Sequence, residues 1–153
     1  MYKNILVAVD GSATSLRGLH EAIRLAKATG ARLLLLHVLN TLILETEIAS
    51  TAYYQALADE IRSSGSKILE HAAMVARDAG VPFESKMIEK IGAHAWKEIV
   101  AQASESGVEL IVLGTHGRRG LKRLILGSDA ELVLRHAPVP VLMVRDQLAA
   151  SAA

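Results

Sequence analysis

The sequence predicts an α/β fold: a single-domain, open, doubly wound sheet of five parallel strands with helices on both faces. Three observations support this fold class. Short apolar runs alternate with helical patterns along the chain. Three of these runs are almost continuously apolar, as in strands that helices cover on both sides, and glycine ends three of the helical patterns directly before a strand. With 153 residues, of which 51% are hydrophobic, the chain is long enough for one domain with a sizeable core.

The five expected strands are short and spread along the whole chain. They cover residues 4–10, 32–38, 83–88, 109–114 and 139–144. The third run, FESKMI, alternates between apolar and polar residues and is expected near an edge of the sheet. The last run is expected at an edge or a bulge, because Pro138 and Pro140 supply no N–H group to a strand ladder. The crossovers between strands are expected to be right-handed.

Capping residues mark several helix boundaries. Ser12 or Thr14 can cap the first helix, which has apolar residues along one side. Gly30, Gly80 and Gly107 are each expected to end a helical pattern in the left-handed conformation that glycine adopts at little cost.

The least regular region covers residues 40–66. We expect a variable loop followed by a helix here, with the run SSGS at 63–66 interrupting what otherwise reads as one long helix. The folded domain is expected to span residues 1–147. The tail, residues 148–153, has little to bury and is expected to be frayed.

Composition excludes several classes of function. The chain has no cysteine, which removes disulfides, thiolate nucleophiles and cysteine-based zinc sites. Its formal net charge is +1 and its aromatic content 3%, whereas nucleic-acid-binding proteins usually carry a basic excess or a stacking platform. We therefore expect no nucleic-acid partner. No apolar run approaches the roughly 20 residues of a membrane span and no signal-peptide pattern is present, so we expect a cytoplasmic protein without a membrane partner.

A glycine-rich segment follows the fourth expected strand. It reads G-x-x-G, nine residues, then G-S, with Gly114, Gly117, Gly127 and Ser128 at these positions. We expect Gly114 to let the chain turn at the end of the strand, Gly117 to let main-chain N–H groups approach an anion, and Gly127-Ser128 to open the next helix. A helix N-terminus favours phosphate. The spacing is neither a P-loop nor the G-x-G-x-x-G pattern of dinucleotide-binding folds.

The chain resembles the universal stress protein family along nearly its whole length. The resemblance rests on the opening ILVAVDGS, on LLHV, on the turn at Gly80, on GTHGRRG and on the closing LGSDAELVLRHAPVPVLMV. The motif G-x-x-G-x9-G-[ST] is typical of the ATP-binding members, and every position is present here. The resemblance implies a Rossmann-like sheet of order 3-2-1-4-5, of the adenine nucleotide alpha hydrolase-like type, with a ligand crevice where strands one and four end side by side. One departure is the stretch GAHAWKEI at 92–99, where the family often has a proline-containing turn.

Carried over position by position, the family pattern implies roles for six residues. Asp10 would lie near the ribose or a phosphate-bound Mg²⁺, and the backbone of Val38 would face the adenine edge. The ribose and phosphates would be surrounded by Gly114, Gly117, Gly127 and Ser128. Asp10 could instead start a turn by accepting a hydrogen bond from its own backbone.

Three neighbouring residues are secondary candidates for ATP binding. His116 lies inside the glycine-rich segment, where its imidazole could contact phosphate or be solvated. Arg118 and Arg119 belong to a short basic cluster that could contact phosphates, face an acidic partner, or simply be solvated.

The leading hypothesis for function is an ATP-binding universal stress protein that acts as a nucleotide-dependent regulatory or stress-response switch toward an unidentified protein partner. The segment offers a phosphate cradle without an evident general base or nucleophile. Two alternatives stay open: a slow Mg²⁺-dependent ATPase that uses Asp10, and a nucleotide-free dimeric scaffold. A homodimer is expected through the last strand, which begins at Val139 and ends at Val144, because an exposed apolar edge invites pairing.

Overall fold

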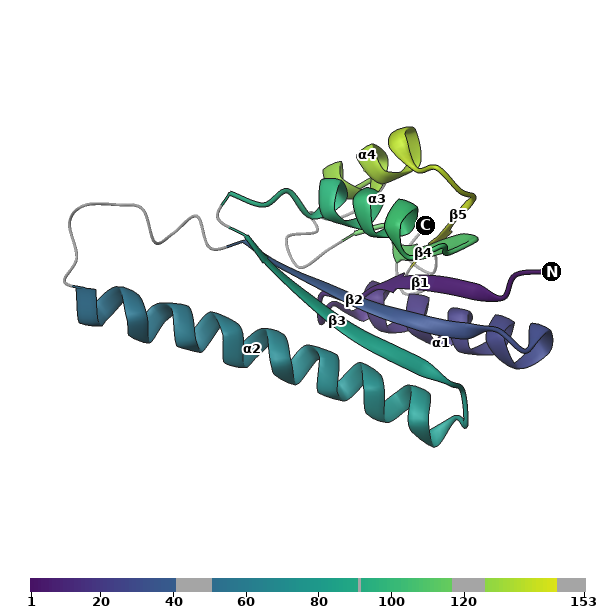
Figure 1. Ribbon diagram of the computed structural model, residues 1–153, viewed down its shortest axis with the longest axis horizontal. Coiled ribbons are helices and arrows are strands. Elements are labelled where there is room, and N and C mark those ends of the chain that lie inside the picture. Colours follow the sequence, from purple (N-terminus) through teal and green to yellow (C-terminus); the bar gives the residue numbers. More distant parts are fainter. Residues whose placement is uncertain (41–50, 91, 117–125, 146–153) are drawn as a thin grey trace, which may run out of the picture.

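The computed structural model describes residues 1–40, 51–90, 92–116 and 126–145. All five strands are parallel and lie in the order β3-β2-β1-β4-β5 (Figure 1), which confirms the predicted fold class and strand order. The elements in chain order are β1 (Asn4–Ala8), α1 (Ala13–Thr29), β2 (Arg32–Asn40), α2 (Thr51–Asp78), β3 (Phe83–Lys90), α3 (Ala95–Glu105), β4 (Leu110–Gly114), α4 (Ser128–His136) and β5 (Val141–Val144).

Helices cover both faces of the sheet and create two hydrophobic cores. Helices α1 and α2 pack on one face, and α3 and α4 pack on the other (Figure 1). Because side chains alternate along a strand, Ile5 and Val7 of β1 belong to the first core and Leu6 belongs to the second. All three side chains are 0% exposed, and burial of each contributes roughly 1.5–3 kcal/mol. The central strands are therefore the most firmly held part of the fold.

The capping residues behave largely as their chemistry predicts. Ser12 is the N-cap of α1, and its side chain accepts a hydrogen bond from the N–H of Ser15. Gly30, Gly80 and Gly107 have φ values of 73°, 71° and 60°, so the predicted left-handed helix ends are confirmed.

Helix α2 corrects one prediction, because it runs without a break through residues 63–66. The reason is the packing of Gly65 against the sheet. A Cβ atom on Gly65 would lie 2.9 Å from Leu39 Cδ2 and 3.1 Å from both His37 Cδ2 and Met87 Sδ. Here glycine brings the helix close to β2 and β3, and this close packing outweighs its low helix propensity of roughly 1 kcal/mol relative to alanine.

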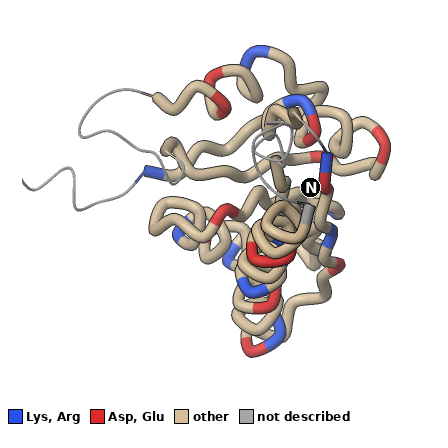
Figure 2. Tube along the Cα trace, turned by 90° about the vertical axis from the view of Figure 1, so that its left-hand side faces the viewer, with Lys and Arg blue, Asp and Glu red and all other residues tan. Residues whose placement is uncertain are grey.

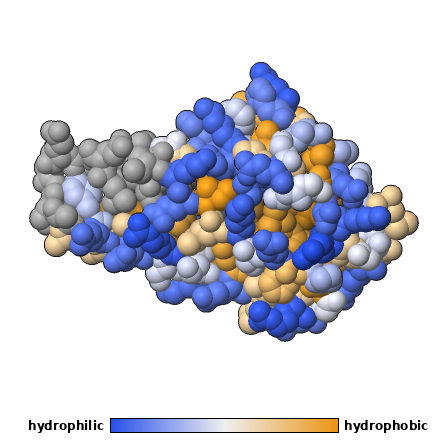
Figure 3. Space-filling view, in the orientation of Figure 1, coloured by the Kyte–Doolittle hydropathy of each residue, from blue (hydrophilic) through white to orange (hydrophobic). Residues whose placement is uncertain are grey.

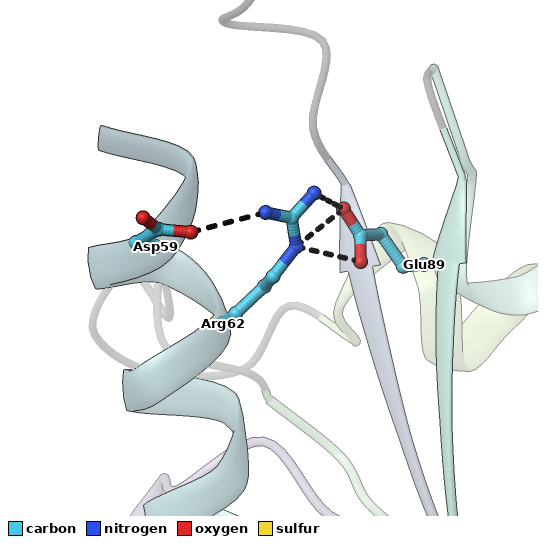
Figure 4. Close-up of polar contacts among 3 residues, drawn as sticks. All are labelled: Asp59, Arg62 and Glu89. Atoms are coloured by element: carbon cyan, nitrogen blue, oxygen red, sulfur yellow. Dashed lines mark hydrogen bonds and ion pairs between the residues drawn. The ribbon is translucent and has the colours of Figure 1, made fainter. Parts of the chain in front are cut away.

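Strand β3 lies at one edge of the sheet, as its alternating pattern predicts, and an ion-pair network joins it to α2. Arg62 of α2 donates hydrogen bonds to both carboxylate oxygens of Glu89 on β3, at 2.7–3.0 Å, and to Asp59 at 3.2 Å (Figure 4). These hydrogen bonds from Arg62 hold the pKa of Glu89 below its ordinary value of 4.5. The Glu89 carboxylate in turn raises the pKa of Arg62. Strand β3 is thereby tied to the helix that covers it.

Strand β5 lies at the opposite edge, as predicted, but it is shorter than expected. It begins at Val141 rather than at Val139, directly after Pro140. The carbonyl of Pro140 still accepts a hydrogen bond from the N–H of Ile111, whereas the proline nitrogen has no hydrogen to donate. In contrast, β2 and β3 each continue two residues beyond the predicted ends, to Asn40 and Lys90, where they pair with each other.

The described surface carries mixed charge. Basic and acidic residues alternate along α2 when this helix is viewed from its end (Figure 2). On the face that shows α2 and β3, apolar residues reach the surface in small areas separated by hydrophilic ones (Figure 3). Within the described ranges, none of the helices combines the length and apolar character required to cross a bilayer.

Candidate functional site

Most of the described candidate residues lie where β1 and β4 end side by side. The register pairs Ile5 with Leu110 and Val7 with Val112, so both strands point the same way and finish at the same edge of the sheet. In such parallel sheets the crevice beyond the carboxyl ends is where ligands bind. The turn after β1, the residues after β4 and the start of α4 all meet at this edge.

Asp10 forms the turn that leads from β1 into α1. Its Oδ1 accepts a hydrogen bond from the N–H of Ser12 at 2.8 Å, and its own N–H donates to Ser15 Oγ at 3.1 Å. The turn interpretation of Asp10 is therefore observed. A carboxylate has about four lone-pair positions, so this hydrogen bond leaves capacity for a ligand.

The peptide groups of Val38 on β2 point toward the same end of the sheet. Leu36 directs its carbonyl toward β1, where it accepts a hydrogen bond from Val9 N–H at 2.9 Å. In a strand, residues two apart direct their peptide groups to the same side. Val38 therefore directs its peptide groups past the end of β1, which stops at Ala8. His37, between them, is buried and places Nδ1 2.6 Å from the carbonyl oxygen of Val9.

Gly114 has a different role from the one predicted. It does not turn the chain: it stays within β4, paired with Val144, and it is not among the described glycines with positive φ. Instead, a Cβ atom on Gly114 would lie 2.8 Å from both the carbonyl carbon and Oγ1 of Thr14. Gly114 is thus required for the close approach of α1 to the end of β4, a contact that the spacing of the glycines does not reveal.

Hydroxyl groups join the start of α1 to the residues after β4. Thr14 Oγ1 donates to the carbonyl of His116 and lies 3.2 Å from Ser12 Oγ. Thr115 Oγ1 lies 2.9 Å from Nδ1 of His116. The two sides of the switch point are therefore connected through side chains that are largely buried.

The start of α4 is the part of the site that suits a phosphate group. Gly127 is the N-cap, as predicted, and no described side chain caps the helix. The N–H of Gly127 donates to the carbonyl of Thr115 at 2.9 Å, which places the helix start beside the end of β4. The first N–H groups of a helix have no partner within the helix and attract anions.

Acidic residues modify the potential at this helix start. Asp129 and Glu131 lie in the first turn of α4, where they offset part of its positive end. Asp129 Oδ1 also accepts a hydrogen bond, at 3.4 Å, from the N–H of Trp96, the second residue of α3. Trp96 stacks on His136 at 5.0 Å between ring centroids and packs against the second hydrophobic core.

His116 provides an independent sign of a ligand site. Its Nε2 is buried and has no hydrogen-bond partner among the residues that the structure describes. Buried polar atoms are almost always paired, and an unpaired one often marks a functional position. The N–H groups at the start of α4, which no described side chain caps, fit an anionic group such as phosphate, whereas the Asp10 carboxylate suits a hydroxyl group or a cation that accompanies it.

Part of the predicted site lies outside the described residues. This applies to Gly117, Arg118 and Arg119, so their predicted roles stay predictions. Across the described ranges, no group of three or more histidine or carboxylate side chains is arranged to hold a metal ion.

The comparisons with known proteins identify the family. The universal stress protein family profile matches residues 1–145. Universal stress protein YxiE of Bacillus subtilis is 37% identical over 151 residues, covering 95% of this chain and 100% of the relative. The chain therefore belongs to the universal stress protein family.

Solved structures of similar fold include nucleotide complexes. Hypothetical protein MJ0577 superposes with a TM-score of 0.83 at 27% identity, covering 95% of this chain and 97% of that one. A universal stress protein in complex with cAMP gives a TM-score of 0.69 at 28% identity, covering 94% and 97%. The protein from Archaeoglobus fulgidus in complex with dAMP gives 0.69 at 26% identity, covering 94% and 98%.

Proposed function

We propose that this universal stress protein binds ATP at the switch point and acts as a nucleotide-dependent regulatory switch rather than as a catalyst. The observation that carries the proposal is the start of α4, which no described side chain caps and which the Gly127–Thr115 hydrogen bond holds beside the end of β4. The turn that contains Asp10 leads into α1, whose Thr14 is hydrogen-bonded to His116 just after β4. Related proteins of the same fold bind cAMP and dAMP, which supports an adenine nucleotide as the ligand.

In this proposal, the predicted residues divide the contacts to the nucleotide among them. Phosphates lie at the N–H groups of Ser128 and the following residues, with Gly117, Arg118 and Arg119 as further contacts. Asp10 faces the ribose or a Mg²⁺ ion that arrives with ATP, and the peptide groups of Val38 receive the adenine edge. Mg²⁺ would supply charge neutralisation at the phosphates.

Calorimetry with ATP, with and without Mg²⁺, tests binding directly. We expect heat at sub-millimolar nucleotide, and mass spectrometry of the freshly purified protein is expected to detect retained nucleotide. AMP, cAMP and GTP are the comparison ligands. Absence of heat with all four nucleotides would contradict the proposal and favour the nucleotide-free dimeric scaffold.

The slow Mg²⁺-dependent ATPase is the second candidate, and Asp10 is the residue that would distinguish it. Phosphate release by protein that binds ATP is expected to stay at the buffer background. Turnover above background that disappears in Asp10→Asn, with ATP affinity retained, would instead support the ATPase.

Substitution at Gly117 tests where the site lies. Gly117→Val places a branched side chain where main-chain N–H groups are proposed to approach phosphate, and is expected to weaken ATP binding by about tenfold or more. Gly117→Ala adds a single methyl group and is expected to weaken ATP binding less than Gly117→Val does. Thermal denaturation of both variants checks that the fold is intact, and unchanged affinity in Gly117→Val would show that the site is elsewhere.

We also propose that the protein is a cytoplasmic homodimer that pairs through β5. All four residues of β5 are half-buried rather than covered, and the strand lies at a sheet edge. Sedimentation velocity is expected to give twice the 16.4 kDa chain mass. The substitution Leu142→Lys is expected to shift the monomer–dimer equilibrium toward monomer, because a charge on an edge strand opposes pairing.

A further inference from the structure

We infer that Thr14 is a positioning residue of the nucleotide site, whose hydroxyl group fixes the main chain of His116 at the start of the glycine-rich segment. This inference rests on the proposed function and adds to it a residue of α1 that lies outside the glycine motif. Thr14 was predicted only as one of two candidates for capping α1, and Ser12 fills that role.

The surroundings of Thr14 show that its position is closely defined. Its side chain is 7% exposed, although threonine at a helix start is usually solvated. It occupies the space beside Gly114, where an added Cβ atom would lie 2.8 Å from its Oγ1. Gly114 and Thr14 therefore depend on each other: Thr14 can pack against the end of β4 because Gly114 has no side chain.

The directions of the hydrogen bonds around Thr14 follow from its donors and acceptors. The carbonyl of His116 can only accept, so the single hydroxyl hydrogen of Thr14 goes to it. Ser12 must then donate its hydroxyl hydrogen to Thr14 Oγ1, at 3.2 Å, while Ser12 Oγ accepts from the N–H of Ser15. Each hydroxyl group in this chain thus has one defined orientation.

This chain of hydrogen bonds determines where the glycine-rich segment leaves the sheet. Thr115, the residue before His116, accepts the hydrogen bond of Gly127 that positions the start of α4. Release of the His116 carbonyl would therefore loosen both the beginning of the segment and the helix end at which phosphate is proposed to bind. Thr14 acts on the ligand through these main-chain groups and does not contact it.

The experiment uses Thr14→Val, which keeps the shape of the side chain and removes the hydroxyl group. Thr14→Ser keeps the hydroxyl group and serves as the rescue variant. Thr29→Val is the matched control, because Thr29 donates to the carbonyl of Leu25 at 2.9 Å at the other end of the same helix. Two quantities are measured: the ATP dissociation constant, and the hydrogen exchange rate of the Gly127 amide by NMR in the nucleotide-free protein.

We expect Thr14→Val to raise both the dissociation constant and the exchange rate about tenfold, the change that corresponds to one lost hydrogen bond. Thr14→Ser and Thr29→Val are expected to match the wild type in both. Equal ATP affinity in Thr14→Val and wild type would overturn the inference. Failure of the wild type to bind any nucleotide would overturn the proposed function and this role together, and the exchange rate would then show whether Thr14 still orders the segment without a ligand.

Discussion

Gly114→Ala is the substitution whose effect on the free energy of unfolding follows most directly from the structure. The new methyl group would lie 2.8 Å from the carbonyl carbon of Thr14, whereas carbon atoms in contact normally stay about 3.5–4.0 Å apart. Backbone on both sides must therefore separate by about 0.7 Å or more. Overpacking of this kind costs roughly 1–3 kcal/mol, and disturbance of the Thr14–His116 hydrogen bond adds about 1 kcal/mol. Alanine has the smaller entropy loss in a strand and offsets roughly 0.5–1 kcal/mol of this cost, so we expect a net decrease of about 1–3.5 kcal/mol in the free energy of unfolding.

Gly18→Ala is the matched control for this interface. Gly18 lies on α1 opposite Gly114, but a Cβ atom there would be 3.7 Å from its nearest neighbours, an ordinary contact. Alanine also gains about 1 kcal/mol of helix propensity, so this variant is expected to be slightly more stable than wild type. Urea denaturation measures both changes, and for a chain of this size the Gly114→Ala loss corresponds to a decrease of about 2–14 °C in Tm. Wild-type stability in Gly114→Ala, or equal losses in both variants, would refute the assignment of Gly114 to the contact with Thr14.

Two further predictions concern helix capping and acid stability. Ser12→Ala removes the N-cap of α1 and is expected to lower the free energy of unfolding by about 1 kcal/mol, measured by urea denaturation; an unchanged midpoint would contradict the cap. The pKa of Glu89 is lowered in the folded protein, so the stability from its contact with Arg62 is present above 4.5 and is lost as pH falls through the folded pKa. Glu89→Gln is therefore expected to be less stable than wild type at pH 7, with the difference shrinking at pH values below 4.5. Glu84→Gln on the same strand, which has no ion pair within the described part of the chain, is the control; a difference that persists in acid would contradict this account.

The order and type of the elements follow from local sequence patterns. The apolar runs at β1 and β4 predict strands covered on both faces, and the three helix-ending glycines do adopt positive φ. The prediction for SSGS was wrong because the pattern shows only that glycine and serine are weak helix formers. It does not show that Gly65 faces Leu39 and Met87, which come from strands before and after the helix.

The site was predictable only in part, for a similar reason. The position of Gly127 at a helix start follows from the sequence alone, because glycine and the following serine precede a helical pattern. The role of Gly114 depends on Thr14, which is 100 residues earlier in the chain and carries no signal of this contact. The buried Nε2 of His116 likewise depends on packing between elements.

The two edges of the sheet differ in a way that limits how the protein can assemble. Exposed charged residues occupy the β3 edge (Glu84, Lys86, Glu89 and Lys90), whereas β5 consists of four apolar residues. Of these two edges, β5 is therefore the one that suits the proposed pairing with a second copy. When two copies pair there around a twofold axis, both outer edges of the combined sheet are β3, and the charges on them oppose the addition of a third copy. In the proposed dimer, the composition of the β3 edge would therefore end association at two chains instead of letting it continue into a fibre.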